Sequence, residues 1–152
     1  MKVFSPPEKL DIQDHYSVFL AGSIKSDTAE EWQHTVIHAC SDTAITFLNP
    51  RRKSWDVHWK QEITNPVFKE QVNWELDALE QANFIIMYFD PATKSPISLL
   101  ELGLFARSNK IIVCCPEGFW RKGNVDIVCE RYGVSQVPSL EALITIIKKN
   151  CL

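Results

Sequence analysis

The chain has 152 residues, of which 45% are hydrophobic and 23% are charged, a composition typical of one folded domain. These proportions exclude a disordered chain, a collagen-like chain and a coiled coil as descriptions of the whole sequence. The formal net charge of −3, from 16 Lys and Arg against 19 Asp and Glu, argues against a nucleic-acid-binding protein, because such proteins usually carry a basic surface.

Apolar, strand-like segments alternate with helix-like segments along the chain. In chain order, the sequence predicts strand 16–22, helix 28–40, strand 44–48, helix 66–82, strand 84–89, helix 96–107, strand 111–115, helix 125–131, strand 134–137 and helix 140–150. Four of the helices begin at capping signals, which are Asp27 with Glu30, Asn65-Pro66, Ser95-Pro96 and Ser139.

This alternation predicts βαβ units and a mostly parallel sheet of about five strands with helices on both faces. We therefore expect an α/β fold, a single flavodoxin-like or Rossmann-like sandwich over residues 1–152. Ligands of such sheets bind beyond the carboxyl ends of the strands. The segments expected at that edge are 22–26, 49–53, 90–95 and 116–124.

Cysteine usage and apolar runs indicate the compartment. The five cysteines are odd in number and contain no CxxC pair, so neither a disulfide framework nor a zinc ribbon is expected. No apolar run approaches the ~20 residues of a membrane span, and residues 1–15 lack a signal-peptide core. We expect a cytoplasmic protein without membrane association. His34 and His38 fall on the solvent face of their helix without a third ligand, so no metal site is expected.

Two glutamates occupy apolar helical positions. Glu75 lies in the middle of the apolar stripe of helix 66–82, and Glu101 is the only acid of helix 96–107, which is apolar nearly all round and is predicted to be buried. Ser98 lies one turn before Glu101 on the same face. Buried glutamates usually have partners, so each forms a structural ion pair or a capped carboxylate, or the two form a catalytic pair. A catalytic pair would supply a nucleophile and a proton-handling acid, as in glycosidic bond cleavage through a covalent intermediate.

Other candidates at the same edge each have a plainer explanation. Asp90 binds a base or a sugar hydroxyl, or it closes an Asp-Pro turn. Gly22 and Ser23 let backbone amides approach a ligand, or they form a tight turn. Arg51 begins the basic run after the second predicted strand, and it either grips a phosphate or is solvated.

Three segments carry a family resemblance: VFLAGSI at 18–24, ELDALEQAN at 75–83 and SPISLLELG at 95–103. They resemble the nucleoside 2-deoxyribosyltransferase-like superfamily, which includes the 2′-deoxynucleoside 5′-phosphate N-hydrolases. The resemblance implies that Glu101, in the family's E-x-G motif, is the nucleophile. It also implies that Glu75 stands where the family usually has an Asp that positions the sugar and handles the proton.

The resemblance implies further roles. Ser95 matches a position that contacts the base as Asp in the transferases and the phosphate as Ser in the hydrolases. Phe19 falls at or beside an aromatic residue, often Tyr, under the sugar. Family members complete their sites across a dimer, so Asn124 is a candidate donor into the neighbouring site. A homodimer or higher homo-oligomer that binds a nucleoside or nucleotide without metal or cofactor is expected.

The function expected from the resemblance is transfer of the sugar of a (deoxy)nucleoside or nucleotide to another base, through a covalent glycosyl-Glu101 intermediate. Hydrolysis of a 2′-deoxynucleoside 5′-monophosphate is the first alternative, which Ser95, Lys25 and the Arg51-Arg52 pair favour because they suit a phosphate. A nucleotide-sensing module without turnover is the second.

Aromatic residues make up 11% of the chain, more than the predicted core accounts for. Trp55, Trp59 and Trp120 lie on predicted loops, where a flat side chain suits a flat nucleobase or a subunit contact. Trp74 is placed on a helix flank, with a subunit contact as its expected role.

Overall fold

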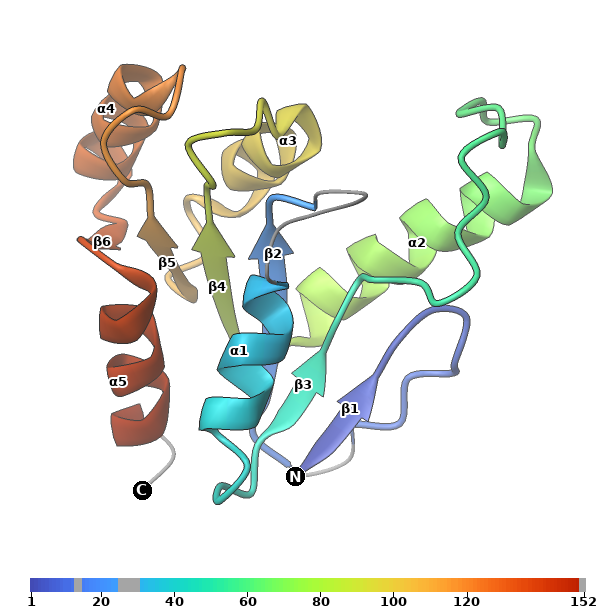
Figure 1. Cartoon of the computed structure of the whole chain (residues 1–152), viewed down its shortest axis with the longest axis horizontal. Helices are drawn as coiled ribbons and strands as arrows, with labels where there is room; N and C mark the ends of the chain where they lie inside the picture. Colours follow the sequence, from blue (N-terminus) through green and yellow to red (C-terminus); the bar gives the residue numbers. More distant parts are fainter. Residues whose placement is uncertain (13–14, 25–30, 151–152) are drawn as a thin grey trace.

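Six parallel strands form one sheet in the computed structural model, which describes residues 1–12, 15–24 and 31–150 (Figure 1). The strands lie in the order β1-β3-β2-β4-β5-β6, and every neighbouring pair is parallel. The elements are β1 (Lys2–Phe4), β2 (Ser17–Gly22), α1 (Trp32–Ala39), β3 (Thr46–Leu48), α2 (Pro66–Gln81), β4 (Phe84–Tyr88), α3 (Pro96–Phe105), β5 (Ile111–Cys114), α4 (Lys122–Tyr132), β6 (Ser135–Val137) and α5 (Leu140–Asn150). The predicted α/β fold with a parallel sheet is confirmed.

The sheet has one strand more than expected, because β1 gives no sequence signal. It is three residues long, and only Phe4 of the three is buried, so it shows neither an apolar run nor an alternation. It forms the sheet edge by pairing with β3, from Lys2 opposite Thr46 to Phe4 opposite Leu48. The predicted capping box and the predicted start of helix 28–40 lie outside the described residues. Within the described residues, α1 begins at Trp32.

Helices cover both faces of the sheet. Residues of β2 alternate between the two faces: Val18 and Leu20 pack in one hydrophobic cluster with α1 and α5, whereas Phe19 and Ala21 pack in the other cluster with α2, α3 and α4. Central strands are therefore buried on both sides, which explains their unbroken apolar sequences. Within the described residues, no helix has both the length and the apolar character that crossing a membrane requires.

The carboxyl ends of β2 and β4 form the topological switch point of the sheet. The chain leaves β2 toward α1 on one face and leaves β4 toward α3 on the opposite face (Figure 1). Ligands of such folds bind at this point of the carboxyl edge. The backbone is tightly joined there. The Ser23 N–H donates to the carbonyl oxygen of Tyr88 at 2.9 Å, and Gly22 has a φ of +137° with its Cα directly against the same carbonyl.

Side chains fix α2 at both ends. Asn65 Oδ1 accepts hydrogen bonds from the backbone N–H groups of Val67 and Phe68, which confirms the predicted cap. At the other end, the Lys110 ammonium group donates to three backbone carbonyl oxygens, those of Leu79, Glu80 and Ala82. A cation at the C-terminus satisfies carbonyl groups that have no partner within the helix. The helix that carries Glu75 is therefore held in place from both directions.

The prediction that helix 96–107 is buried all round is wrong. Ile97, Leu100 and Leu104 are 59%, 61% and 59% exposed. Only Ser98, Glu101 and Leu102 of α3 are buried, because α3 is an outer helix that packs one side against the sheet. The apolar residues on its outer side are therefore not explained by the fold of a single chain.

The expected placement of Trp74 on a helix flank, open to a subunit contact, is also wrong. Its side chain is buried in the cluster beneath α2, and its Nε1–H donates to the backbone oxygen of Glu8 at 2.7 Å. The segment after β1, including Leu10 and Ile12, packs against the same cluster. This segment covers Trp74 and has no regular structure that a sequence pattern could indicate.

Replacing Gly22 by alanine tests the joint between β2 and β4. A Cβ at this position would collide with the Tyr88 backbone in a conformation that L-residues rarely adopt, so Gly22→Ala should lower the free energy of unfolding by about 3 kcal/mol. Gly103→Ala is the matched control, because a Cβ there meets nothing within 4 Å, and it should be neutral or slightly stabilising. Urea denaturation measures both, and equal stability of the two variants would contradict the tight joint.

Candidate functional site

The structure brings Glu75 of α2 and Glu101 of α3 together on one face of the sheet. The Glu101 side chain is 8% exposed, and Glu75 is also largely buried, as its place in an apolar stripe predicts. Burial raises the pKa of Glu75 to about 7, against a smaller opposing effect of its hydrogen bond from Gln71. Burial also raises the pKa of Glu101 to about 8, and the neighbouring charge of Glu75 raises it further.

The two carboxyl groups titrate as an interacting pair. Two carboxyl groups that repel each other in a low dielectric lose their protons in two steps. Glu75 has the lower pKa and is therefore the first of the two to ionise as pH rises, while Glu101 keeps its proton to higher pH. Among the described residues neither glutamate forms an ion pair. The alternative of a capped carboxylate stays open for Glu75, because Gln71 donates a hydrogen bond to it.

Gln71 positions Glu75, although Gln71 was not among the candidate site residues of the sequence. Its Nε2 donates to Glu75 Oε1 at 2.7 Å and to the backbone oxygen of Pro50 at 3.0 Å. Its Oε1 is buried without a partner among the described residues. The only sequence signal is its place one turn before Glu75 on the inward face. Gln71 thus ties the carboxylate to the loop that follows β3.

Three hydroxyl groups meet at the switch point, and we call them the hydroxyl cluster. Ser23 Oγ lies 2.7 Å from Thr93 Oγ1 and 2.6 Å from Ser95 Oγ, and the last two atoms are 2.7 Å apart. The backbone N–H of Asp90 also donates to Ser23 Oγ, at 2.8 Å. The prediction that Ser95 caps its helix is wrong, because Ser95 has a φ of 47° and its hydroxyl makes no capping hydrogen bond. Thr93 was not singled out in the sequence.

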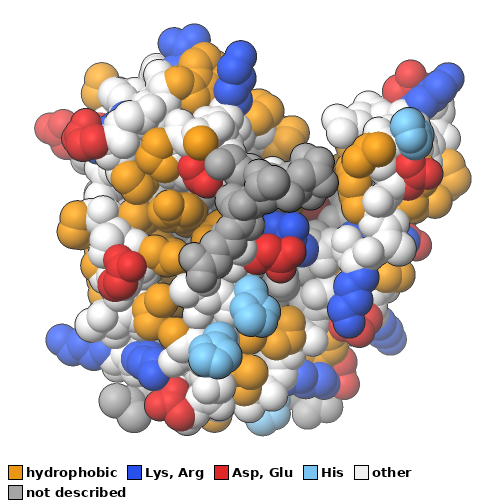
Figure 2. Space-filling view, in the orientation of Figure 1, with side chains coloured by type: hydrophobic (Ala, Val, Ile, Leu, Met, Phe, Trp, Pro, Cys, Tyr) orange, Lys and Arg blue, Asp and Glu red, His pale blue; other side chains and the backbone are white. Residues whose placement is uncertain are grey.

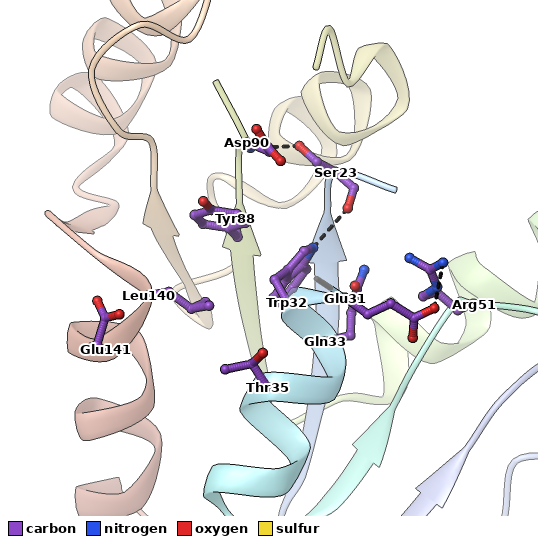
Figure 3. A pocket seen from close by; sticks show the side chains of 10 residues that line it. All are labelled: Ser23, Glu31, Trp32, Gln33, Thr35, Arg51, Tyr88, Asp90, Leu140 and Glu141. Carbon is purple, nitrogen blue, oxygen red and sulfur yellow. Dashed lines mark hydrogen bonds and ion pairs between the residues drawn. The ribbon is translucent and has the colours of Figure 1, made fainter. Parts of the chain in front are cut away.

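Arg51 and Asp90 line a cavity of about 310 Å³ on the face that carries α1 and α5 (Figure 3). The Arg51 guanidinium group forms an ion pair with Glu31 at 2.9 Å, so its charge is already balanced. Asp90 Oδ1 accepts a hydrogen bond from the Ala92 N–H at 2.8 Å. Asp90 therefore fulfils the turn role that the sequence allowed, while its side chain also borders the cavity.

The other predicted site residues differ in their burial and in their distance from the switch point. Gly22 lies at the switch point and Ser98 is buried one turn before Glu101. Phe19 has no exposed surface and packs in the core on the side of α2 and α3, so direct contact with a ligand has no support from its position. Asn124 is exposed, and it lies in the first turn of α4 instead of on a loop.

The three loop tryptophans differ in their surroundings. Trp55 and Trp59 pack edge to face with ring centroids 5.2 Å apart, and the Arg52 guanidinium group lies 5.3 Å from the Trp59 ring. Trp120 donates its Nε1–H to the backbone oxygen of Lys94 at 2.9 Å. Trp120 therefore braces the loop that leads to Ser95, while the other two form a separate aromatic pair.

His34 and His38 stack on the exposed side of α1 with ring centroids 6.3 Å apart, as predicted, and Figure 2 shows histidine side chains at the surface there. No group of three or more His, Cys, Asp or Glu suited to a metal ion occurs in the described ranges. Burial raises the pKa of Cys115 to about 12, so this thiol stays protonated at neutral pH.

A parallel α/β fold with buried acids and a cavity beside its carboxyl edge defines a domain suited to binding a small molecule there. The sequence model described as "Nucleoside 2-deoxyribosyltransferase like" matches residues 15–119, and the chain belongs to this family. The matched region contains Glu75, Glu101 and the hydroxyl cluster, and it ends before Asn124. The membership confirms the resemblance seen in the sequence.

A solved structure supports the fold. The crystal structure of a conserved protein from Enterococcus faecalis V583 is similar to this chain, with a TM-score of 0.64 and 12% sequence identity. The similarity covers 90% of this chain and 99% of the other. None of the curated proteins matches the sequence.

Removing either buried carboxylate should stabilise the protein at alkaline pH. The pKa values of Glu75 and Glu101 in the folded state, about 7 and about 8, lie above the ordinary value of 4.5. The folded state therefore binds more protons than the unfolded state, and stability falls as pH rises toward 8. Glu75→Gln and Glu101→Gln should each raise the free energy of unfolding at pH 8.5 by on the order of 1–3 kcal/mol, with little gain at pH 4.5.

Urea denaturation at the two pH values measures this effect. Asp77→Asn is the control, because Asp77 is exposed on the same helix as Glu75, and it should show no such dependence on pH. A loss of stability in Glu101→Gln at pH 8.5 would instead mean that an unseen partner holds the ionised carboxylate.

Proposed function

We propose that this chain cleaves the N-glycosidic bond of a (deoxy)nucleoside or nucleotide through a covalent glycosyl-Glu101 intermediate and transfers the sugar to another base. Family membership supports nucleoside chemistry in general. The observation that carries the specific proposal is the buried pair of Glu75 and Glu101, in which the charge of Glu75 helps to raise the pKa of Glu101. A retaining reaction needs one ionised and one protonated carboxyl group. Because the higher pKa belongs to Glu101, its proton must pass to Glu75 or to water before Glu101 can attack.

In the proposed reaction, an ionised Glu101 oxygen attacks the anomeric carbon of the sugar. The bond from that carbon to the base nitrogen breaks, and the nitrogen takes its electron pair and a proton from Glu75 or from water. A nitrogen of a second base then attacks the anomeric carbon and releases the Glu101 carboxylate. The Glu75 carboxylate takes up the proton that the incoming base loses. Gln71 keeps Glu75 in place through both steps by its 2.7 Å hydrogen bond.

Hydrolysis of a 2′-deoxynucleoside 5′-monophosphate is the second candidate, and the hydroxyl cluster favours it. Ser23, Thr93 and Ser95 present three hydroxyl groups within 2.7 Å of one another at the switch point. Hydroxyl donors in such an arrangement suit the oxygen atoms of a phosphate. Water would then replace the second base as the attacking group. Arg51 contributes less to this candidate, because Glu31 already pairs with it.

The reaction products distinguish the candidates. The protein is incubated with each deoxynucleoside and each deoxynucleoside monophosphate, with and without adenine, and the products are separated chromatographically. A new nucleoside indicates transfer, whereas free base alone indicates hydrolysis. Glu101→Ala should lower turnover by at least about 10⁴-fold, while Asp77→Asn should retain it. Turnover that survives Glu101→Ala would remove Glu101 as the nucleophile, and thermal stabilisation by a nucleotide without turnover would indicate a sensing module.

We also propose that the protein forms a homodimer or higher homo-oligomer through the outer side of α3. Ile97, Leu100 and Leu104 lie at i, i+3 and i+7, so they form one exposed apolar stripe. The stripe lies on the same helix as Glu101, and Asn124 is exposed on the following helix, α4. A second chain seated on this stripe would cover the apolar surface and place its own groups beside the carboxylate pair.

Mixing two inactive variants tests the shared site. If Asn124 of one chain completes the site of its neighbour, Asn124→Ala and Glu101→Ala should each be inactive, and a 1:1 mixture should recover roughly a quarter of wild-type activity through mixed dimers. Leu100→Glu should convert the oligomer to monomers in sedimentation equilibrium, whereas Val57→Glu, at another exposed apolar residue, should not. A monomeric wild-type protein would contradict the proposal.

A further inference from the structure

The side-chain amide of Gln71 is held between two oxygen acceptors. Gln71 is 3% exposed, and its Nε2 donates one hydrogen bond to the backbone oxygen of Pro50 and one to Glu75 Oε1. A carbonyl oxygen can only accept, so Nε2 has to face Pro50. The opposite orientation would place two oxygen atoms against each other. The loop after β3, and not Glu75, therefore determines which way the amide points.

This orientation leaves Gln71 Oε1 buried with no hydrogen-bond partner among the described residues. A buried acceptor without a partner destabilises a fold, so stability alone does not explain a glutamine at this position. In this orientation the amide offers Glu75 a donor and no acceptor. It therefore stabilises the ionised carboxylate, and it lowers the pKa of Glu75 against the larger opposing effect of burial.

The Pro50 carbonyl group is itself fixed by its neighbours. Asn49 Oδ1 accepts a hydrogen bond from the Arg51 N–H at 3.1 Å, which closes a turn around Pro50. The Asn49 N–H donates to the backbone oxygen of Phe4 at 2.9 Å, and the Pro50 ring is buried. The carbonyl group is therefore held in one position, and the amide of Gln71 is held with it.

Two ion pairs fasten the same loop to the helices. Arg51 pairs at 2.9 Å with Glu31, which directly precedes α1 (Figure 3). Arg52 pairs at 3.0 Å with Glu70 of α2. Each arginine therefore has an acid of its own. The contact between this loop and Glu75 is an amide hydrogen bond and not a basic charge.

We propose that Asn49, Pro50 and Gln71 act together as positioning residues for Glu75, and that their fixed amide donor lets Glu75 release its proton to the leaving base. The inference rests on the proposed function. Glu101 faces Glu75 from α3, and its pKa responds to the charge of Glu75.

The proposed donor acts at the step in which the glycosidic bond breaks. The Glu101 proton first passes to the Glu75 carboxylate, and the Glu101 carboxylate then attacks the anomeric carbon. The bond to the base breaks with its electron pair on the nitrogen, which takes the proton from Glu75. Negative charge returns to Glu75 at that moment, and the Gln71 N–H already points at the oxygen that carries it.

A carboxyl ¹³C NMR titration of Glu75 tests the inference without any substrate. Gln71→Met keeps an unbranched side chain of similar length but removes the donor, so the pKa of Glu75 should rise by about one pH unit from its value of about 7. Gln81→Met makes the same exchange at an exposed position of α2 and should leave this pKa unchanged. An unchanged pKa of Glu75 in folded Gln71→Met would overturn the inference.

Asn49→Ala tests the turn around Pro50 without altering α2. The pKa of Glu75 should rise by less than in Gln71→Met, and Asn49→Ala should add nothing when combined with Gln71→Met, because both act through one hydrogen bond. Asn73→Ala, at an exposed position of α2, is the matched control and should have no effect. If Gln71→Met does not fold, Asn49→Ala decides alone, and a wild-type pKa of Glu75 in that variant would contradict the proposed role.

Kinetics separate positioning from structure. Gln71→Met should lower kcat by about tenfold with little change in KM. The acid limb of its kcat/KM profile should move to higher pH together with the pKa of Glu75, because Glu75 must be ionised to take the Glu101 proton. A merely structural role would reduce the amount of active enzyme and leave the limb where it is in wild type, and that result would also reject the inference.

The two readouts keep this inference apart from the proposed function. If the pKa of Glu75 rises in Gln71→Met but wild-type protein cleaves no nucleoside or nucleotide, the proposed reaction fails and the positioning of Glu75 stands. If wild-type protein is active and Gln71→Met changes neither this pKa nor the pH profile, the reaction stands and the positioning role fails.

Discussion

The joint between the carboxyl ends of β2 and β4 is the constraint on which the rest of this structure depends. Ser23 forms the joint through two hydrogen bonds. Its N–H donates to the Tyr88 carbonyl oxygen, and its Oγ accepts from the Asp90 N–H. Gly22 permits this contact, since no larger residue fits against the Tyr88 backbone. The chain diverges to opposite faces of the sheet from this point. The carboxylate pair lies on one side of the joint, and the cavity that Arg51 and Asp90 line lies on the other.

Two unpaired acids inside a folded chain oppose its stability, and the surrounding structure compensates for them. Asn65 and Lys110 fix the ends of α2, so that Glu75 cannot relax toward water by shifting its helix. Gln71 restrains the carboxylate itself with one hydrogen bond that leaves it largely desolvated. Reactivity and rigidity are thus linked, because the same packing that raises the pKa of Glu75 also holds it in place.

The sequence predicts most of the fold and the two acids, but little of what surrounds them. Apolar alternation indicates the central strands, and Glu75 and Glu101 stand out because an acid in an apolar stripe is rare. Gln71 does not stand out in this way, since a glutamine at an inward helical position also suits an exposed helix. The contacts of Ser23 with Thr93 and Ser95 join residues about 70 positions apart, which no local pattern encodes. The composition of α3 also predicts a fully buried helix, because the residues on its exposed outer side are as apolar as those of a core.

The hydroxyl cluster has a consequence for the polarity of the site. A hydroxyl group can donate or accept, and it changes between the two by rotating one hydrogen atom. The Thr93 hydroxyl group donates its proton to the backbone oxygen of Asp90 at 2.8 Å, whereas the hydrogen bond between Ser23 and Ser95 can reverse its direction without moving any heavy atom. One rigid arrangement then serves both an electron-rich group such as a phosphate and an electron-poor group such as an amine.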